Sequence, residues 1–308
     1  MEGLTVSSAD TAVLASPLDI EGAVAVVTGG ANGIGRAIVG ALLDRGATVV
    51  IADVEAPVLE STVAALAGRG AVSGVRTDVT DEASVAALAD HVFDTHGRCN
   101  LLFLNAGVTS GGGGLPWRQE PNDWRWCFGV NVFGVGIGAT EFVPRMIESG
   151  EPGQIVVTSS GDGGFAPVPT ASVYAASKAA VSCFTEALHL NLISEGTALR
   201  ASVFYPSGGL LDTGLFTAAR NRPEHLQRQG AGTGRTGMTF DELKATVAKA
   251  TGREPAVADL DELGRFVVDS VERRDFIIAN GLEATGELLH RRAEAISRGD
   301  LPPPYRVA

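Results

Sequence analysis

The sequence predicts an α/β fold, a doubly wound parallel sheet of about seven strands with helices on both faces. Short apolar runs rich in β-branched residues alternate, from Gly22 onward, with longer stretches of helical period. That alternation is typical of repeated strand–helix–strand units and a parallel sheet. The first unit also places a glycine-rich turn between its strand and its helix. The 308 residues are enough for one large domain of this kind.

Strands are predicted where the apolar runs lie, at residues 23–28, 48–52, 71–76, 100–104, 154–159, 199–205 and 275–279. Helices are predicted between them at residues 33–45, 57–68, 81–96, 122–148, 171–195 and 259–272. Asp81 is expected to cap the third of these helices, whose apolar face opens near Val85. An amphipathic run at residues 282–297 predicts one more helix after the last strand.

These elements predict a single folded domain over residues 19–280, with a loose tail at residues 1–18 and a helical extension at residues 281–308. Residues 206–255 are too many for a plain connection in a compact domain, so we expect a lid over the substrate. The four-glycine run at residues 111–114 is either an ordinary surface loop or part of the site.

The charge balance disfavours polyanionic partners. The 36 acidic and 24 basic residues give a formal net charge of −12, which repels nucleic acid and anionic membranes. Cys99, Cys127 and Cys183 lie far apart outside any CxxC pair, so they are expected to be buried residues in a reducing compartment. The sequence has no signal-peptide pattern, and charges or glycines interrupt its long apolar windows. We therefore expect a cytoplasmic protein without nucleic-acid or membrane partners.

The first turn has the features of a phosphate-binding loop. Residues 24–38 read VAVVTGGANGIGRAI, an apolar strand followed by glycines and a helix. Gly29 permits a tight turn, Gly33 lets the backbone approach a pyrophosphate, and Gly35 lets the helix pack on the strand. The free N–H groups of the helix start would face the anion. A purely structural turn is the alternative interpretation.

A carboxylate follows the second strand, where Asp53 ends the run VVIAD. At that position a carboxylate accepts hydrogen bonds from both hydroxyls of an adenine ribose and repels a 2′-phosphate, which favours NAD over NADP. A solvated Asp at a strand end is the alternative. Asp78 and the Asn105–Ala106–Gly107 turn follow the third and fourth strands, where the adenine and ribose would pass. Each of them alone resembles an ordinary turn residue.

Tyr174 and Lys178 are four residues apart at the start of a predicted helix, so they share one face of it. An adjacent ammonium favours the phenolate and lowers the pKa of a tyrosine, which would make Tyr174 a general base toward an alcohol. The spacing alone is common by chance. It gains weight because the helix follows a fifth strand that ends at Ser159 and Ser160, in a chain that begins with a nucleotide loop.

Together these motifs resemble the short-chain dehydrogenase/reductase family, from Leu18 to Asn280. They are TGGANGIG at residues 28–35, DV at 78–79, NAG at 105–107, Asn131 within VNVFGV, SS at 159–160 and YAASK at 174–178, all in the order of the family. The resemblance implies a Rossmann-type sheet with strand order 3-2-1-4-5-6-7. It also implies a catalytic tetrad of Asn131, Ser160, Tyr174 and Lys178.

In that resemblance Ser160 would hydrogen-bond the substrate oxygen, Tyr174 would exchange the proton, and Lys178 would hold the nicotinamide ribose and lower the pKa of Tyr174. Asn131 would bend its helix and anchor a proton-relay water, the rival role being to satisfy buried backbone. Ser159 stays the alternative to Ser160, which lies one residue farther from Tyr174 than is usual. The implied cofactor contacts are Thr28, Gly29, Asn32, Gly33, Ile34, Gly35, Asp53, Asp78, Val79, Asn105, Ala106, Gly107, Tyr174, Lys178, Pro206 and Thr213.

One segment departs from the family pattern. The family clamps the nicotinamide carboxamide with a Pro–Gly pair and a following Thr, whereas this chain reads PSGGLLDT, so Pro206 and Thr213 stand two residues too far apart. The run FVPRMIESG and the extra C-terminal helix resemble the longer bacterial members, including those that oxidise aryl or other bulky secondary alcohols. Family members pair through the helices that hold Asn131 and Tyr174, so we expect a homodimer or homotetramer. The candidate contact residues are Phe142, Cys183, Phe184 and Leu188.

The leading hypothesis is an NAD-dependent oxidoreductase that interconverts a secondary alcohol and its ketone by hydride transfer. A sensor or scaffold that binds the dinucleotide without turnover is the alternative, but it has no need for Tyr174 and Lys178 together. An epimerase or dehydratase of the extended branch predicts TGxxGxxG and a larger C-terminal domain, neither of which this sequence has. The five histidines show no metal-ligand spacing, so no metal site is expected.

Overall fold

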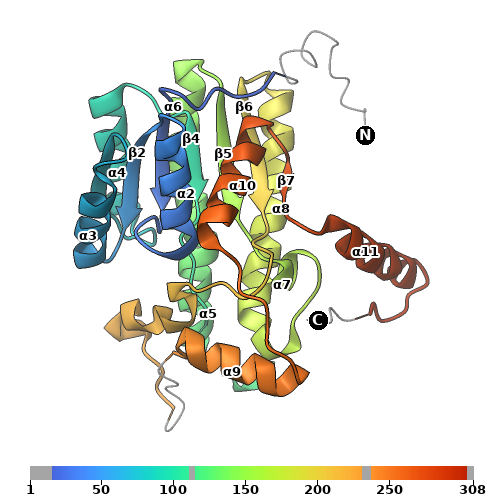
Figure 1. The fold of residues 1–308 in the computed structure, drawn as a ribbon. Coiled ribbons are helices and arrows are strands. Elements are labelled where there is room, and N and C mark those ends of the chain that lie inside the picture. The colour runs from blue at the N-terminus through green and yellow to red at the C-terminus, as the bar shows by residue number, and fades with distance from the viewer. Residues whose placement is uncertain (1–15, 111–114, 231–236, 304–308) are drawn as a thin grey trace.

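The computed structural model describes residues 16–110, 115–230 and 237–303. Its centre is a seven-stranded parallel sheet in the order β3-β2-β1-β4-β5-β6-β7 (Figure 1). Because β1 and β4 are neighbours, the chain winds first toward one edge of the sheet and then toward the other. The predicted doubly wound fold and its strand order are confirmed. The glycine run at residues 111–114 lies outside the described residues.

The strands are β1 (Val24–Thr28), β2 (Thr48–Asp53), β3 (Val72–Arg76), β4 (Leu101–Leu104), β5 (Gly153–Thr158), β6 (Leu199–Phe204) and β7 (Ile277–Ile278). The helices are α2 (Gly33–Asp44), α3 (Ala56–Leu66), α4 (Glu82–His96), α5 (Pro121–Phe128), α6 (Gly134–Ser149), α7 (Gly161–Gly164), α8 (Ser172–Ser194), α9 (Phe240–Thr251), α10 (Leu260–Glu272) and α11 (Leu282–Ser297). The short 3-10 helices are η1 (Pro116–Arg118), η3 (Pro169–Ala171), η4 (Gly214–Asn221) and η5 (Glu224–Leu226). As predicted, Asp81 caps α4.

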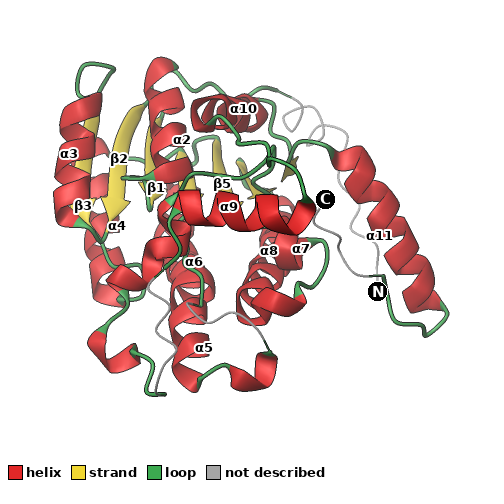
Figure 2. Ribbon diagram, turned by 60° about the horizontal axis from the view of Figure 1, so that its bottom comes forward, coloured by secondary structure: helices red, strands yellow, loops and turns green. Residues whose placement is uncertain are grey.

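Two apolar layers enclose the sheet, one on each face (Figure 2). Helices α2, α3 and α10 cover one face with side chains such as Leu42 and Val267. Helices α4, α6 and α8 cover the other face with side chains such as Leu88 and Met146. Strands buried on both faces show nearly continuous apolar runs instead of alternation, which is why the sequence marks them so clearly.

The helix predicted over residues 122–148 consists of three consecutive segments. α5 ends at Phe128, a π-helical turn (η2) covers Gly129–Phe133, and α6 continues from there. This turn holds Asn131, and π turns inside helices are frequent at functional sites. Among the described residues, this run is the one stretch long and apolar enough to cross a membrane, and more than half of it is buried inside the protein, as in a core helix.

The described part of the segment predicted as a lid, for which we keep the name lid, contains a helix that the prediction lacks. A bridge between Leu210 and Val257 closes its neck. Beyond the neck the chain forms η4 and η5 and then α9. α9 begins with a capping box, in which Thr239 and Glu242 each accept the backbone N–H of the other. The sequence TFDE at residues 239–242 therefore carries a helix-start signal.

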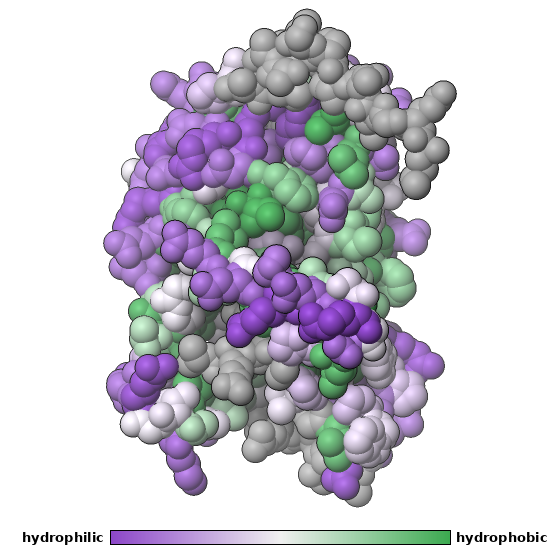
Figure 3. Space-filling model, turned by 90° about the vertical axis from the view of Figure 1, so that its right-hand side faces the viewer, coloured by the Kyte–Doolittle hydropathy of each residue, from purple (hydrophilic) through white to green (hydrophobic). Residues whose placement is uncertain are grey.

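The ends of the domain differ from the prediction in one respect. Leu18, assigned to the tail, is buried, and its N–H donates to the Glu272 carbonyl at 2.8 Å. The predicted C-terminal helix is present as α11, which projects from the body after β7 (Figure 1). On this side of the molecule a band of hydrophilic side chains crosses the middle of the surface, with apolar surface above it (Figure 3).

Two expectations about burial are wrong. Cys183 is exposed rather than buried, because it lies on a face of α8 directed away from the sheet. Phe142 is only 1% exposed and packs in the core between α6 and the sheet, so it offers no contact surface for a partner. Phe184 and Leu188, by contrast, line an open groove between α6 and α8. The predicted subunit contact would fall on that groove.

Candidate active site

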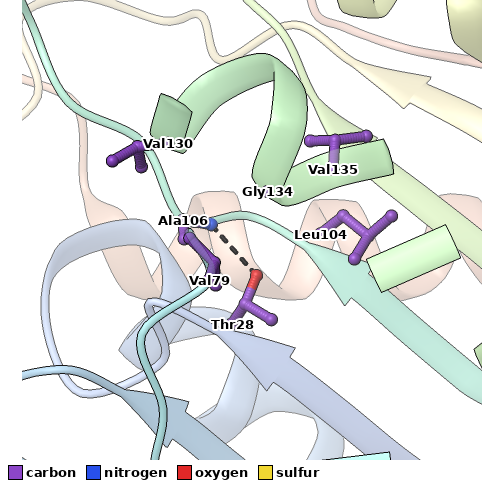
Figure 4. A pocket seen from close by; sticks show the side chains of 7 residues that line it. All are labelled: Thr28, Val79, Leu104, Ala106, Val130, Gly134 and Val135. Atoms are coloured by element: carbon purple, nitrogen blue, oxygen red, sulfur yellow. Dashed lines mark hydrogen bonds between the residues drawn. The ribbon is translucent and has the colours of Figure 1, made fainter. Parts of the chain in front are cut away.

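The carboxyl end of β1 is tied to the loop after β4 through Thr28. Its hydroxyl donates to the Phe103 carbonyl and accepts the N–H groups of Asn105 and Ala106 at 2.9 and 3.1 Å. Figure 4 shows the bond to Ala106 beside a small pocket with walls of Val79, Leu104, Val130 and Val135. Because the hydroxyl is fully used in these contacts, Thr28 shapes the loop rather than facing a ligand.

Asn105 extends this network across the sheet to β5. Its amide donates to the carbonyls of Thr28 and Gly29, and its side-chain oxygen accepts the Thr158 hydroxyl at 3.1 Å. The ends of β1, β4 and β5 are therefore held together by satisfied buried polar groups, which form a rigid edge. Gly107 follows on this edge and lies beside the side chains of Lys178 and Asn131.

The glycine loop leaves its backbone bare where a phosphate would bind. Asn32 caps α2 by accepting the Gly33 N–H at 2.7 Å. Gly33 has a φ of +52°, and a Cβ on it would lie 3.0 Å from the Cβ of Thr213. A Cβ on Gly35 would lie 2.2 Å from the Gly29 carbonyl oxygen. Neither position has room for a side chain, whereas Ile34 packs against the core.

Asp53 lies half-buried at the end of β2, next to this loop. Its two carboxylate oxygens accept the N–H groups of Ala31 and Glu55, both at 3.1 Å. Burial raises the pKa of this carboxyl, and backbone hydrogen bonds from Glu55, Ala31 and Val54 oppose the rise. A carboxylate has about four acceptor sites, so Asp53 keeps acceptor capacity for a ribose hydroxyl. Asp78, after β3, instead accepts the N–H and hydroxyl of Thr80.

Tyr174, Ser160 and Lys178 come together between β5 and the start of α8. The side chains of Ser160 and Tyr174 are hydrogen-bonded to each other. The Lys178 Nζ is buried, donates to the Thr158 carbonyl at 2.8 Å and lies 5.8 Å from the centre of the Tyr174 ring. The Lys178 ammonium is therefore held at the end of β5, and Lys178 follows Tyr174 by one turn of α8.

The two serines after β5 have different surroundings. Ser159 is buried, donates to the Lys178 carbonyl at 2.9 Å and is hydrogen-bonded to Ser182 at 2.7 Å. Ser160 instead accepts the Asp162 N–H at 3.1 Å and contacts the Tyr174 hydroxyl. Only Ser160 shares the site with Tyr174, so the geometry favours it over Ser159.

Asn131 is fully buried in the π turn and makes the backbone contacts that its rival role describes. It accepts the Val108 N–H at 2.8 Å and donates to the Val108 carbonyl at 3.0 Å and to Ser177 at 2.9 Å. Ser177 donates in turn to the Tyr174 carbonyl. Asn131 thereby joins the loop after β4 to the start of α8, which fixes the place of Tyr174.

Burial dominates the pKa values of the pair on α8. It raises the pKa of the Tyr174 phenol above its ordinary range, while the hydrogen bond to Ser160 opposes the rise and the charge of Asp162 adds to it. Burial lowers the pKa of Lys178 to about 8. In the protein alone burial outweighs any lowering of the Tyr174 pKa by Lys178, whose ammonium donates to the Thr158 carbonyl. The lowering expected with the nicotinamide bound stays a prediction.

The lid contacts the glycine loop through Thr213 and the loop after β2 through Arg220, of which the sequence predicted only Thr213. Pro206 follows β6, and Thr213 lies against Gly33, as a phosphate-loop neighbour would. The guanidinium of Arg220 spans the gap to Glu55 and makes two hydrogen bonds, of 2.5 and 3.0 Å. Local spacing gives no signal for this pair, since its members are 165 residues apart.

A second ion pair, also missing from the prediction, attaches the lid to α5. Arg222 donates to Asp123 at 2.9 Å and to the Leu226 carbonyl at 2.6 Å, with both charged side chains almost completely buried. Arg228 approaches the other Asp123 oxygen at 3.3 Å and also pairs with Glu120. Residues 222–230 are therefore anchored on the start of α5.

Known proteins share this arrangement. A model of the short chain dehydrogenase family matches residues 23–224. The chain belongs to this family. It is 36% identical over 242 residues to a 1-deoxy-11-beta-hydroxypentalenate dehydrogenase of Streptomyces avermitilis, covering 77% of this chain and 84% of that one. The relatives act on hydroxyl groups, and the chain is accordingly an oxidoreductase of the short-chain dehydrogenase/reductase type.

Solved structures agree with the fold and with a dinucleotide site. A short-chain dehydrogenase/reductase from Burkholderia phymatum in complex with NAD superposes with a TM-score of 0.82 at 34% identity, covering 94% of this chain and all of that one. A metagenomic short-chain oxidoreductase in complex with NADP gives 0.57 at 31% identity, over 62% and 85%. The family binds a nicotinamide dinucleotide, and the bare Gly33 backbone together with the Asp53 carboxylate fits such a group.

Proposed function

We propose that the protein is an NAD-dependent dehydrogenase that interconverts a secondary alcohol and its ketone. The observation that carries the proposal is the contact of Ser160 with Tyr174 above the buried Lys178, at the same sheet edge as the glycine loop. A sensor that binds the dinucleotide without turnover would not need Ser160, Tyr174 and Lys178 together. No cluster of His, Cys, Asp and Glu suited to a metal ion occurs in the described ranges of the chain.

The chain's own residues divide the chemistry between them. Ser160 and Tyr174 hydrogen-bond the substrate oxygen, and Tyr174 takes the hydroxyl proton during oxidation or returns it during reduction. When bound, the nicotinamide supplies the hydride acceptor or donor. Lys178 places a positive charge near the phenol and Asn131 keeps the start of α8 in place, so the proton is transferred at a fixed atom.

Asp53 supports NAD rather than NADP as the cofactor. Both of its oxygens are held toward the loop by backbone N–H groups, and a 2′-phosphate there would meet a carboxylate. Arg220, a cation of the lid that reaches the loop after β2, is already paired with Glu55. A phosphate would therefore have to displace one carboxylate and approach another, which costs binding free energy.

An apolar contact of the lid and the name of a relative favour a bulky substrate. The lid packs on α5 through a buried apolar cluster of Val108, Trp126, Val130, Ala218 and Leu226. The pentalenate dehydrogenase relative acts, by its name, on a polycyclic hydroxy acid. We propose an aryl or polycyclic secondary alcohol for this chain as well.

A substrate panel tests the proposed function. Purified protein is incubated with aryl and cyclic secondary alcohols, with NAD and NADP side by side, and reduced nicotinamide is followed by absorbance. We expect turnover with NAD, and a loss of about 10³-fold in kcat in Tyr174→Phe with NAD affinity nearly unchanged. Tight NAD binding without turnover of any alcohol would support the sensor, and a clear NADP preference would overturn the role of Asp53.

A further inference from the structure

Asp162 is a partly buried carboxylate in the candidate site that the proposed proton transfer does not use. It follows Ser160 by two residues, and its N–H donates to the Ser160 hydroxyl oxygen at 3.1 Å. Its charge lies close enough to Tyr174 to raise the pKa of the phenol. Asp162 therefore lies beside both groups that would hold the substrate oxygen.

The backbone around Asp162 is fixed against α8. Gly163 has a φ of +100°, and a Cβ on it would lie 1.9 Å from the Ala175 carbonyl oxygen, so this turn touches the helix one residue after Tyr174. The Gly163 N–H donates to the Ala166 carbonyl at 2.8 Å, which closes the turn. The backbone that carries Asp162 therefore has a set position relative to Tyr174.

The carboxylate of Asp162 has no hydrogen-bond donor or ion-pair partner among residues 16–110, 115–230 and 237–303. Asp53 and Asp123, the other shielded carboxylates near the site, accept two or more hydrogen bonds each. Burial raises the pKa of the Asp162 carboxyl, and no hydrogen bond offsets that effect. A carboxylate shielded from water without a donor is costly, and a donor on a bound molecule would relieve that cost.

Resting on the proposed function, we propose that Asp162 accepts a hydrogen bond from a second hydroxyl of the substrate, on the carbon next to the carbinol. Ser160 and Asp162 are two residues apart on one turn, and the Asp162 N–H donates to the Ser160 hydroxyl oxygen. In the proposed complex their two side chains contact neighbouring oxygen atoms of one small molecule. The substrate class is then a vicinal diol, or an α-hydroxy ketone in the direction of reduction.

Matched pairs of alcohols test this assignment. Initial rates are measured with 1-phenylethane-1,2-diol against 1-phenylethanol and with 1,2-octanediol against 2-octanol. The wild type is compared with Asp162→Asn, Asp162→Ala and the exposed control Asp94→Asn. We expect the wild type to prefer the diols by about tenfold or more in kcat/KM, as for a hydrogen bond to a charged group. Asp162→Ala should remove the preference through a higher KM for diols, and Asp162→Asn should keep part of it.

The same measurements separate a binding role from a structural one. Both variants keep the backbone N–H that holds Ser160, so NAD affinity should stay within about twofold. Loss of the Asp162 charge also acts on Tyr174, and therefore on the rates with all alcohols. The test is accordingly the ratio of kcat/KM between each diol and its mono-alcohol. An equal loss on diols and mono-alcohols would show that Asp162 only supports the turn, and would overturn the proposal. A preference for 2-amino-1-phenylethanol that disappears in Asp162→Asn would assign an ammonium group in place of the hydroxyl.

The failure of this inference differs from that of the proposed function. If the wild type oxidises mono-alcohols with the same kcat/KM as diols, the dehydrogenase assignment stands and only the role of Asp162 is overturned. If it oxidises no alcohol of either kind with NAD or NADP, the proposed function is overturned and the diol assignment with it.

Discussion

Two ion pairs, formed by arginines two residues apart in the chain, attach the lid to the body in different surroundings. Arg222 and Asp123 have side chains that are 3% and 0% exposed, whereas Arg220 and Glu55 are 38% and 20% exposed. The buried pair joins the lid to α5, beside the apolar cluster that includes Trp126 and Ala218. The exposed pair crosses to the loop after β2, where Asp53 would hold the adenine ribose.

The difference in burial determines how strongly each ion pair holds the lid. Removing one partner of a buried ion pair leaves an unpaired charge away from water and costs about 3–5 kcal/mol, whereas an exposed pair contributes about 0–1 kcal/mol. The Arg222 contact therefore holds the lid on α5 strongly, and the Arg220 contact holds it on the loop after β2 weakly.

The largest expected effect comes from breaking the buried pair. Arg222→Met leaves Asp123 with the Glu120 N–H at 2.8 Å and the longer Arg228 contact at 3.3 Å. One oxygen of this buried carboxylate loses its ion-pair partner, so the free energy of unfolding should fall by about 3 kcal/mol. Urea denaturation measures the loss, and hydrogen exchange should show faster exchange in residues 214–226. Arg265→Met, at an exposed position on α10, is the matched control. A loss below about 1 kcal/mol would place both ion pairs in the same class and remove the contrast between them.

A smaller effect is expected for the buried charge at the sheet edge. The pKa of Lys178 is lowered by burial from 10.5 to about 8, so the folded protein binds this proton less strongly than the unfolded chain does. The cost of the charge is complete below pH 8 and disappears as the pH rises from 8 to 10.5. Between pH 7 and 9.5 the wild type should gain about 2 kcal/mol of stability relative to Lys178→Met.

Urea denaturation of both proteins at the two pH values measures this difference, and Lys249→Met on the exposed face of α9 controls for the loss of a lysine. A constant difference between wild type and Lys178→Met would contradict the lowered pKa. In that case the Lys178 ammonium would be as stable in its buried position as the Arg222 guanidinium is in its buried ion pair.

The rigid edge of the site was predictable because its signals are local. Tyr174 and Lys178 share a helix face through their spacing, and Asp53 ends a strand that its own apolar run defines. Parallel strands place such ends at one edge of the sheet, so the order of the motifs along the chain largely determines their positions in space. The residues that surround these groups are distant in the sequence, so the burial that raises the pKa of Tyr174 could not be predicted from the spacing of the motifs.

The lid was not predictable for the same physical reason. Arg222 and Asp123 are 99 residues apart, and no periodic pattern connects them. α9 is an exception, because Phe240, Leu243 and Val247 have helical spacing and a capping box marks its start, although none of its residues is buried. Cys183 and Phe142 were misjudged because sequence period gives the width of an apolar face but not which neighbour covers it.

The smallest effect is expected for the exposed pair, and it concerns kinetics. Arg220→Ala should change the free energy of unfolding by less than about 1 kcal/mol, because solvent screens the pair. NAD should nevertheless dissociate about two- to fivefold faster, since the contact that closes the lid over the loop after β2 is lost. Stopped-flow displacement of NAD measures the dissociation rate directly, and the reversed pair Glu55→Arg with Arg220→Glu should restore it. An unchanged rate would mean that the lid stays closed without this contact, so that the Arg222 anchor alone determines its position over the cofactor.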